Sequence, residues 1–122
     1  MPQSPSEHQI RTEPFPRRVR VYFGGVPVAD SKRARLLFET GHSPVHYFPP
    51  DDVRMDLLEH TDKHTRCPWK GEASYWTISA GERSSENAAW GYLDPLPDRV
   101  DIKGYIAFYR DRMDAWSEGD EA

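Results

Sequence analysis

Short apolar runs separated by glycine and proline restrict the fold of this chain more than any other feature of its sequence. The 122 residues include 8 glycines and 11 prolines, and they leave no room for the several long helices that a parallel α/β sheet needs between its strands. Val19, Val21 and Phe23 alternate with their neighbours at the period of a half-buried strand. Gly24-Gly25 then supplies the positive φ angles of a tight hairpin turn, and Val26 begins the returning strand.

Three further segments are expected before the cysteine. Residues 32–38 form either a short helical turn or a continuing strand, and the sequence leaves both alternatives open. Residues 45–48 form a short apolar strand, which the two prolines after it end. A helix is predicted from residue 51 or 52 to about 61, because three apolar residues then share one face: Val53, Leu57 and Leu58.

The second half of the chain predicts more strands and few helical residues. Residues 73–79 form a strand with Tyr75 and Thr77 on one face and with Trp76 and Ile78 on the other. The remaining segments are a polar loop at 81–87, extended structure at 88–92, a strand at 105–109, a turn at 110–112 and a strand at 113–116 that pairs back.

The length of the chain predicts one domain, since 122 residues are enough to bury roughly two-thirds of the surface that the unfolded chain exposes. Residues 1–16, with four prolines among polar residues, are expected to form a flexible arm. Residues 17–116 form the domain, and the acidic residues 117–122 form a flexible tail. The fold class is therefore mostly β: a single compact, folded-over antiparallel sheet with one or two short helices.

The charge of the chain argues against a nucleic-acid partner. The formal net charge is -4 at pH 7, whereas proteins that follow phosphates carry a basic surplus or a basic stripe. No apolar run approaches the roughly 20 residues that cross a bilayer, so no membrane partner is expected. A single cysteine cannot form an internal disulfide, and the N-terminus shows no signal peptide, so the expected compartment is the cytoplasm.

The cysteine lies in the segment with the greatest concentration of reactive residue types, Cys67-Pro68-Trp69-Lys70-Gly71. Cys67 can act as a nucleophile if the positive charge of Lys70 or His64 stabilises its thiolate. The favoured alternative is a small buried hydrophobic residue. Lys70 either holds an anion in an aromatic crease or extends into solvent. Pro68 and Gly71 also have a structural use, because they turn the chain into the next strand.

Tyrosine and tryptophan recur in the predicted strands. Their rings can wall a pocket for a flat ligand while their polar groups orient it, or they can fill the core as cross-strand pairs. Because a core made of all these rings would overfill a small domain, some of them are expected at a groove. The residues assigned to ligand binding are Tyr47, Lys70, Tyr75, Trp76, Tyr92 and Tyr105.

Two pairs of histidines have a spacing that can place both rings on one side of a helix or strand: His42 with His46, and His60 with His64. Pro44 interrupts the first pair, and neither pair has the His-Glu-x-x-His order of a zinc protease. Exposed polar histidines explain both pairs. We therefore predict no metal site and no cofactor.

Several short motifs are spread over residues 17–116: Arg17-Arg18-Val19-Arg20-Val21, Gly25, Val28-Ala29-Asp30-Ser31, Tyr47-Phe48-Pro49, Asp52-Val53, Cys67-Pro68-Trp69-Lys70-Gly71, Tyr75-Trp76, Ala89-Trp90-Gly91-Tyr92 and Ala107-Phe108-Tyr109. Together they resemble the bacterial family called domain of unknown function 427. The resemblance implies a single β-tent domain, similar in outline to methionine sulfoxide reductase B and to small zinc-binding guanine-nucleotide-exchange proteins, and it implies no established activity. Zinc-binding relatives of that fold use pairs of cysteines, so the single cysteine excludes a four-thiolate site and leaves a reductase thiol without a resolving partner.

These observations support one leading hypothesis and two alternatives. The leading hypothesis is a small cytoplasmic domain that binds a small anionic or planar molecule in an aromatic-lined pocket, with Lys70 and Tyr47 as polar contacts. The first alternative is an enzyme that uses Cys67 as a nucleophile, or Tyr47, Tyr105 and His64 as acid–base groups. The second is a protein-interaction module, including a homodimer, that uses a strand edge or an aromatic patch.

Overall fold

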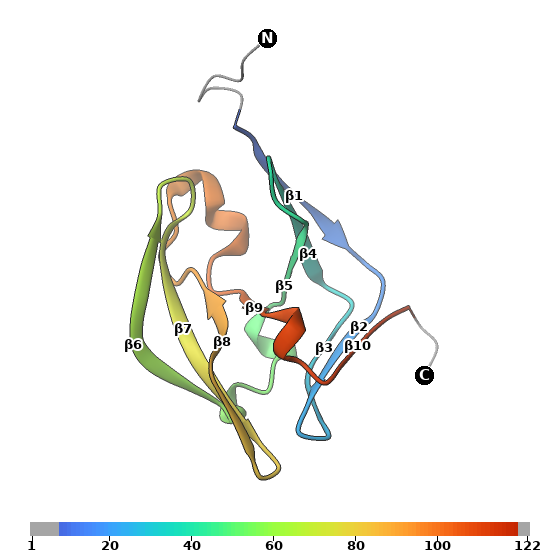
Figure 1. The fold of residues 1–122 in the computed structure, drawn as a ribbon. Helices are drawn as coiled ribbons and strands as arrows, with labels where there is room; N and C mark the ends of the chain where they lie inside the picture. The colour runs from blue at the N-terminus through green and yellow to red at the C-terminus, as the bar shows by residue number, and fades with distance from the viewer. Residues whose placement is uncertain (1–7, 120–122) are drawn as a thin grey trace.

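Three antiparallel sheets make up the part of the chain that the structure describes, residues 8–119 (Figure 1). In this computed structural model, a four-stranded sheet in the order β6-β7-β8-β9 stands opposite two three-stranded sheets in the orders β1-β4-β5 and β10-β2-β3. The strands are β1 (Ile10–Phe15), β2 (Val19–Phe23), β3 (Val26–Ser31), β4 (Ala34–Glu39), β5 (Val45–Tyr47), β6 (Leu58–Cys67), β7 (Gly71–Ala80), β8 (Arg83–Gly91), β9 (Ile106–Phe108) and β10 (Ala115–Glu118). The helical segments among these residues are short 3-10 turns: η2 (Pro50–Asp52), η3 (Met55–Leu57), η4 (Pro97–Ile102) and η5 (Arg110–Arg112).

Backbone hydrogen bonds join the sheets into one compact domain. Phe48, just after β5, exchanges two hydrogen bonds with Ile106 of β9, each 2.8 Å long. The first three-stranded sheet therefore continues into the four-stranded one. The prediction of a mostly β, folded-over antiparallel fold is confirmed.

The turns β2–β3 and β7–β8 meet at the lower end of the molecule in Figure 1. Gly24 has a φ of +60°, and a Cβ atom there would lie 2.3 Å from the carbonyl oxygen of Ala80, so only glycine fits. Asp114 fastens the same turns, because its Oδ2 atom accepts from the Gly24 N–H at 2.8 Å and from Nη1 of Arg83 at 2.6 Å. We call this the closed end.

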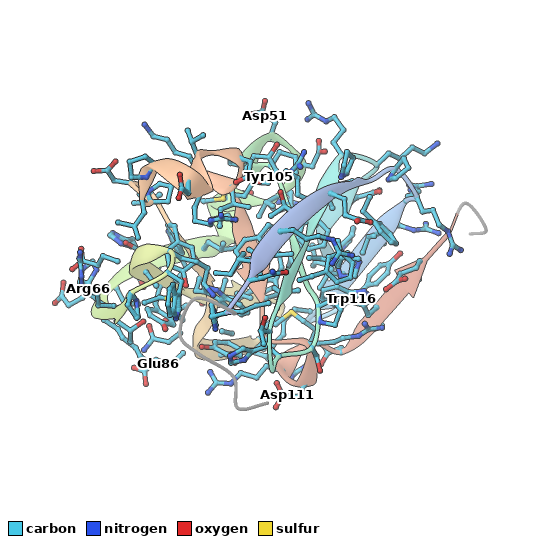
Figure 2. The ribbon with its side chains drawn as sticks, turned by 90° about the horizontal axis from the view of Figure 1, so that it is seen from above. Asp51, Arg66, Glu86, Tyr105, Asp111 and Trp116 are labelled. Atoms are coloured by element: carbon cyan, nitrogen blue, oxygen red, sulfur yellow. The ribbon has the colours of Figure 1, made fainter. Side chains whose placement is uncertain are left out.

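Two hydrophobic clusters fill the space between the sheets, and they use alternate residues of β7. Trp76 and Ile78 belong to the first cluster, with Val19, Val21, Phe23, Val28, Ala29, Ala34, Phe48, Val53, Ala80, Ala88, Ala89, Ile106 and Phe108. Ala73 and Tyr75 belong to the second, with Leu37, Tyr47, Tyr92, Ile102 and Ala107. The predicted placement of Tyr75 opposite Trp76 and Ile78 is confirmed. Figure 2 shows Arg66, Glu86 and Asp111 at the periphery, with their ends away from both clusters.

The helix predicted from residue 51 or 52 to about 61 is wrong. Val53 forms an isolated antiparallel bridge with Ala29, Leu57 ends η3, and Leu58 begins β6. The apolar residues whose spacing suggested one helical face therefore lie in three different elements. Pairing with distant strands decided the local conformation here, as it often does for short segments.

Several other segments also differ from the prediction. Residues 34–39 are strand β4, so the strand alternative for 32–38 is right and the helical turn is wrong. Residues 83–87, predicted as a loop, belong to β8, which pairs with β7 in a protruding hairpin. The last strand does not pair back onto 105–109; β10 pairs with β2 at the opposite end of the sequence.

The ends of the domain also lie elsewhere than predicted. Residues 10–15, assigned to a flexible arm, form β1 and pair with β4 over six residues. Ser117 and Glu118, assigned to the tail, belong to β10. The predicted arm and tail also include residues 1–7 and 120–122, which lie outside the described residues. Over residues 8–119, no helix has the length and apolar character to span a bilayer.

Candidate functional site

The Cys67-Pro68-Trp69-Lys70-Gly71 segment is the turn between β6 and β7. Cys67 and Gly71 are partners in the strand register, and the Lys70 N–H donates to the Cys67 carbonyl at 3.2 Å. Gly71 has a φ of +115°, which side chains with a Cβ atom rarely adopt. The Leu96 N–H donates to the Lys70 carbonyl at 2.9 Å. The turn is thus fixed to the loop before η4, and the backbone of Lys70 is held on both sides.

Lys70 forms an ion pair with Glu39, the last residue of β4. Its Nζ atom lies 2.6 Å from Oε1 of Glu39, and the two side chains are only 11% and 8% exposed. The other carboxylate oxygen, Oε2, lies 3.0 Å from Nε2 of His8 and 4.0 Å from Nε2 of His42. An ammonium group has three N–H donors, and Glu39 is the acceptor that Nζ finds among residues 8–119. Two donors of Lys70 remain for a ligand.

The charge of Glu39 follows from its neighbours. Burial raises the pKa of Glu39, but the hydrogen bond and charge of Lys70, assisted by His42 and His8, outweigh burial and bring the pKa below its ordinary value of 4.5. Glu39 is therefore a carboxylate at neutral pH. Because a carboxylate only accepts hydrogen bonds, Nε2 of His8 carries the proton in its contact with Oε2.

A cavity of about 500 Å³, which we call the inner hollow, lies beside this ion pair. Nε1 of Trp90 donates to the Tyr47 hydroxyl at 3.3 Å, and the ring centroids of Tyr47 and Tyr92 are 6.4 Å apart. Nζ of Lys70 lies 6.0 Å from the centroid of the Tyr92 ring. Aromatic faces and polar groups therefore surround one space. The walls include Tyr47, Cys67, Trp69, Lys70, Trp90 and Tyr92.

Both tyrosines of the inner hollow stay protonated. Burial raises the pKa of Tyr47 far above its ordinary 10.0, although the hydrogen bond from Trp90 opposes the shift. Burial also raises the pKa of Tyr92, with smaller contributions from Tyr47 and Cys67. The Tyr92 hydroxyl has no hydrogen-bond partner within the described residues. It can therefore donate to a ligand in the hollow.

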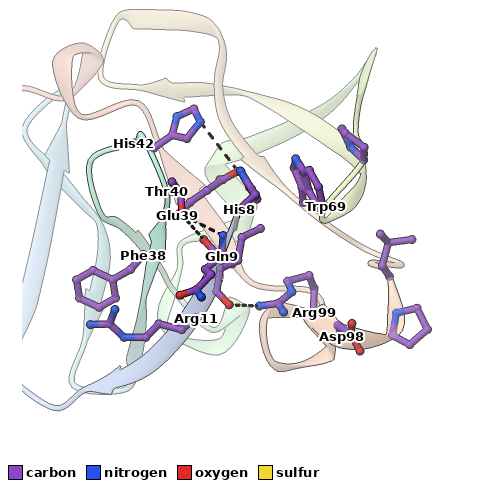
Figure 3. Close-up of a pocket in the computed structure, with 14 residues that line it drawn as sticks. His8, Gln9, Arg11, Phe38, Glu39, Thr40, His42, Trp69, Asp98 and Arg99 are labelled. Carbon is purple, nitrogen blue, oxygen red and sulfur yellow. Dashed lines mark hydrogen bonds and ion pairs between the residues drawn. The ribbon is translucent and has the colours of Figure 1, made fainter. Parts of the chain in front are cut away.

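A second cavity of about 900 Å³, the outer hollow, adjoins the first (Figure 3). It lies between the start of β1, the turn after β4, the β6–β7 turn and η4. Five lining residues belong to both cavities: His8, Glu39, His42, Pro68 and Trp69. The two hollows thus form one open end of the molecule, with Glu39 and its partners at their junction.

The structure brings together four of the residues singled out in the sequence. Tyr47, Lys70 and Tyr92, assigned to ligand binding, line the inner hollow. Cys67, the candidate nucleophile, is half-buried and lines the same cavity. These four residues come from β5, β6, the β6–β7 turn and the segment after β8, so the fold rather than the sequence makes them neighbours.

The other three assigned residues do not line either hollow. Tyr75 belongs to the second cluster, but its hydroxyl shares a 2.8 Å hydrogen bond with Oγ1 of Thr65. Trp76 lies on the opposite face of β7, with its ring centroid 5.2 Å from that of His60. Tyr105 packs against the second cluster. Trp76 is separated from Lys70 and Tyr92 because alternate residues of a strand face opposite ways, whereas Tyr75 and Tyr105 lie in or against the same cluster as Tyr92.

The histidines lie in different surroundings. The rings of His60 and His64 are 6.0 Å apart on β6, the exposed edge strand. His42 is exposed beside Glu39, whereas His46 is largely buried with its ring 4.8 Å from that of Phe15. Within residues 8–119, no group of three or more His, Cys, Asp or Glu side chains could hold a metal ion.

A comparison with known families accounts for the motifs. The model of the family described as Domain of unknown function (DUF427) matches residues 11–119. The chain belongs to this family. The resemblance seen in the short motifs is therefore confirmed, and the description of DUF427 assigns no activity. No curated protein matches the chain.

Three residues that shape the site were missed in the sequence, and one of them, His8, lies just before the residues that the DUF427 model matches. Glu39 lies 31 residues from Lys70 along the chain, and no periodic pattern connects the two. His8 fell within the segment assigned to a flexible arm. Trp69 lies in the recognised Cys67–Gly71 motif, and its place beside Lys70 was the one available signal.

Proposed function

We propose that this DUF427 domain binds a small planar molecule with an anionic or hydrogen-bond-accepting group, and that the inner hollow is its site. The observation that carries this proposal is the largely buried ammonium of Lys70 at the wall of a cavity, with two N–H donors left unused. Cavities of about 300–1,000 Å³ hold small ligands, and the inner hollow measures about 500 Å³.

The other walls support the same class of ligand. The faces of Tyr47, Trp90 and Tyr92 favour a flat molecule. Tyr92 lines the same cavity as Lys70, and its hydroxyl adds a second kind of donor, so the ligand has to offer acceptors. Because Glu39 already compensates the charge of Lys70, a carboxylate and a neutral oxo group both satisfy the site. We place this binding in the cytoplasm, where a single unpaired thiol remains reduced.

Thermal-shift screening of a broad metabolite panel, followed by calorimetric titration, tests the proposal. We expect at least one planar, acceptor-bearing compound to raise the melting temperature. Tyr92→Phe removes one oxygen and should weaken binding of that compound about tenfold, the effect of losing one hydrogen bond. Tyr75→Phe is the matched control, because the Tyr75 hydroxyl bonds to Thr65 instead of facing the hollow. A panel without any stabilising compound, or equal losses from both substitutions, would contradict the proposal.

A second candidate function is suggested by Cys67, because it lines the same hollow as Lys70 and Tyr92. In an enzyme of this kind, the Cys67 thiolate would attack an electrophilic centre of the bound molecule. Alkylation by iodoacetamide, followed by mass spectrometry as a function of pH, tests this role, with Cys67→Ser as the blank. A thiol that reacts only near the ordinary pKa of about 8.5 would argue against nucleophilic catalysis.

A further inference from the structure

A ring of the chain itself occupies the junction of the two hollows. The imidazole of His8 lies against the indole of Trp69, with ring centroids 4.3 Å apart and an angle of 15° between the planes. Its Nε2 atom lies 3.0 Å from Oε2 of Glu39. Figure 3 shows His8 between Trp69 and Glu39. The stacking on Trp69 and the hydrogen bond to Glu39 are the two contacts by which a protein binds a flat ligand ring that carries an N–H group.

The binding partners of His8 are fixed more firmly than His8 itself. Glu39 lies at the end of β4 and is held by Lys70, and Trp69 lies in the β6–β7 turn. His8, by contrast, precedes β1, whose register with β4 begins at Ile10.

The backbone around His8 would not have to change if its ring left the site. Among residues 8–119, the backbone hydrogen bonds nearest the N-terminus are made by Gln9, whose N–H donates to Oγ1 of Thr40 at 2.9 Å and whose carbonyl accepts from the Thr40 N–H at 3.0 Å. No backbone hydrogen bond of His8 itself is found among residues 8–119. The imidazole can therefore leave without breaking the β1–β4 ladder.

We infer that the site takes a planar nitrogen heterocycle whose ring N–H donates to Glu39 while its face stacks on Trp69, and that His8 holds this place in the free protein. The inference rests on the proposed function and gives the planar ligand its chemical class. The heterocycle displaces His8, and its acceptor group then lies toward Lys70 in the inner hollow.

The need for an N–H group follows from Glu39. When the His8 ring leaves, Oε2 of a largely buried carboxylate loses its 3.0 Å hydrogen bond. A hydrocarbon ring would stack on Trp69 equally well, but it would leave that oxygen without a donor, which is unfavourable for a buried charged group. A ring N–H restores the bond. The site therefore discriminates between rings of the same shape by one hydrogen atom.

The experiment uses the full chain with His8→Ala and free imidazole as the probe. At about pH 9, an imidazole of ordinary pKa near 6.5 is neutral and donates one N–H. N-methylimidazole has nearly the same shape and no N–H, so it serves as the matched compound. Binding is followed by the NMR shift of the Trp69 indole N–H. We expect imidazole to bind His8→Ala at least about tenfold more tightly than N-methylimidazole does.

Two further proteins complete the test. In the wild-type protein the tethered His8 competes, so imidazole should bind about tenfold or more weakly than it binds His8→Ala. His8→Phe keeps a tethered ring but offers no N–H to Glu39, so imidazole should bind this variant more tightly than it binds the wild-type protein. Equal affinity for the two compounds, or equal affinity of wild-type protein and His8→Ala for imidazole, would overturn the inference.

The outcomes also separate this inference from the proposed function. If a metabolite binds the wild-type protein in a Tyr92-dependent manner while imidazole does not bind His8→Ala, only the heterocycle inference fails. If imidazole fills the place of His8 but no metabolite of the panel binds, the proposed function fails, and the His8 contact is a structural packing interaction.

Discussion

The closed end of the molecule and its open end bury different chemistry, although strand β7 runs through both. Around the closed end, the first cluster contains aliphatic and phenylalanine side chains such as Val19, Phe48 and Ile78, all fully buried. At the open end, the second cluster contains Tyr47 and Tyr92, which both line a cavity. Burial of the apolar side chains of the first cluster stabilises the fold. The second cluster keeps polar atoms within a largely apolar wall, which is the usual composition of a ligand site.

Removing a large ring from the first cluster should have the largest effect. Phe48 is fully buried, and its ring centroid lies 5.8 Å from that of Phe108 and 5.9 Å from that of Trp116. Phe48→Ala should lower the free energy of unfolding by about 3–5 kcal/mol, because it removes apolar contacts and leaves a cavity. Urea denaturation followed by circular dichroism measures the loss. Leu93→Ala, at a 46% exposed position, is the control and should change little. A similar loss in both variants would break the comparison.

Breaking the buried ion pair between Lys70 and Glu39 at the open end should cause the second-largest loss of stability. Lys70→Met removes the partner of Glu39 and should lower the free energy of unfolding by about 2–4 kcal/mol, because a largely buried carboxylate loses its cation. The double variant Glu39→Gln with Lys70→Met should recover most of the loss, since no buried charge remains. Urea denaturation of the three proteins at neutral pH checks the prediction. A double variant no more stable than Lys70→Met would show that the pair does not act as a unit.

The same variants should respond differently to acid. In the wild-type protein the folded pKa of Glu39 lies below its ordinary 4.5. Its stabilising contribution is therefore complete above that value and is lost as the pH falls through the folded pKa. In Lys70→Met, burial still raises the pKa of Glu39 but the charge of Lys70 no longer lowers it, so the carboxylate protonates at a higher pH. The stability difference between the two proteins should start to shrink above pH 4.5, where the variant's carboxyl group protonates, and should go on shrinking until Glu39 of the wild-type protein protonates below 4.5. Denaturation midpoints measured along a pH series give this difference directly.

The β2–β3 hairpin was predicted better than the outer strands of the four-stranded sheet, and the physical reason lies in the period of the hydrophobic pattern. The alternation of Val19, Val21 and Phe23 is local, so the β2–β3 hairpin could be read directly. Strand β6 lies at the edge of its sheet and is mostly exposed, so it carries no alternation and its start was taken for a helix. Polar β8 residues in the protruding hairpin were taken for a loop for the same reason.

The site was predicted in part for a related reason. Lys70 and Tyr92 attract attention by residue type, since a cation and an aromatic hydroxyl next to a turn indicate chemistry. Glu39 carries no such mark, because its role depends on Lys70, which is distant in the chain. His8 gains its meaning only when β1 pairs with β4 and brings the ring to Trp69. Contacts that the tertiary fold creates between distant residues cannot be found from spacing.

One buried histidine lies beside the first cluster, and its titration gives a further prediction. His46 is largely buried against Phe15, Phe48 and Trp116, and its Nε2 atom has no hydrogen-bond partner within residues 8–119. Burial lowers the pKa of His46 below its ordinary 6.5, although the charge of Glu118 opposes the shift. The folded state therefore prefers the neutral ring, and the contribution of His46 is present above pH 6.5 and is lost as the pH falls below it.

His46→Phe removes this titration and keeps a ring in place. The variant should lose less stability than the wild-type protein between neutral pH and acid, as measured by thermal melting at a series of pH values. The other histidines are common to both proteins, so their contributions cancel in the difference. If the melting temperatures of the two proteins fell in parallel with pH, the protonated His46 ring would have a stabilising partner in the folded state, and the prediction would be wrong.

The smallest change in stability is expected when the hydroxyl group of Tyr75 or Tyr92, both in the second cluster, is removed. Tyr75→Phe breaks the 2.8 Å hydrogen bond to Thr65 and should lower the free energy of unfolding by about 1 kcal/mol. Tyr92→Phe removes a hydroxyl without a partner in the described residues, so its stability should stay within about 0.5 kcal/mol of the wild-type value. Urea denaturation of both variants measures the two changes. If Tyr92→Phe cost as much as Tyr75→Phe, the Tyr92 hydroxyl would already be satisfied within the protein, and the donor that we reserve for a ligand would not exist.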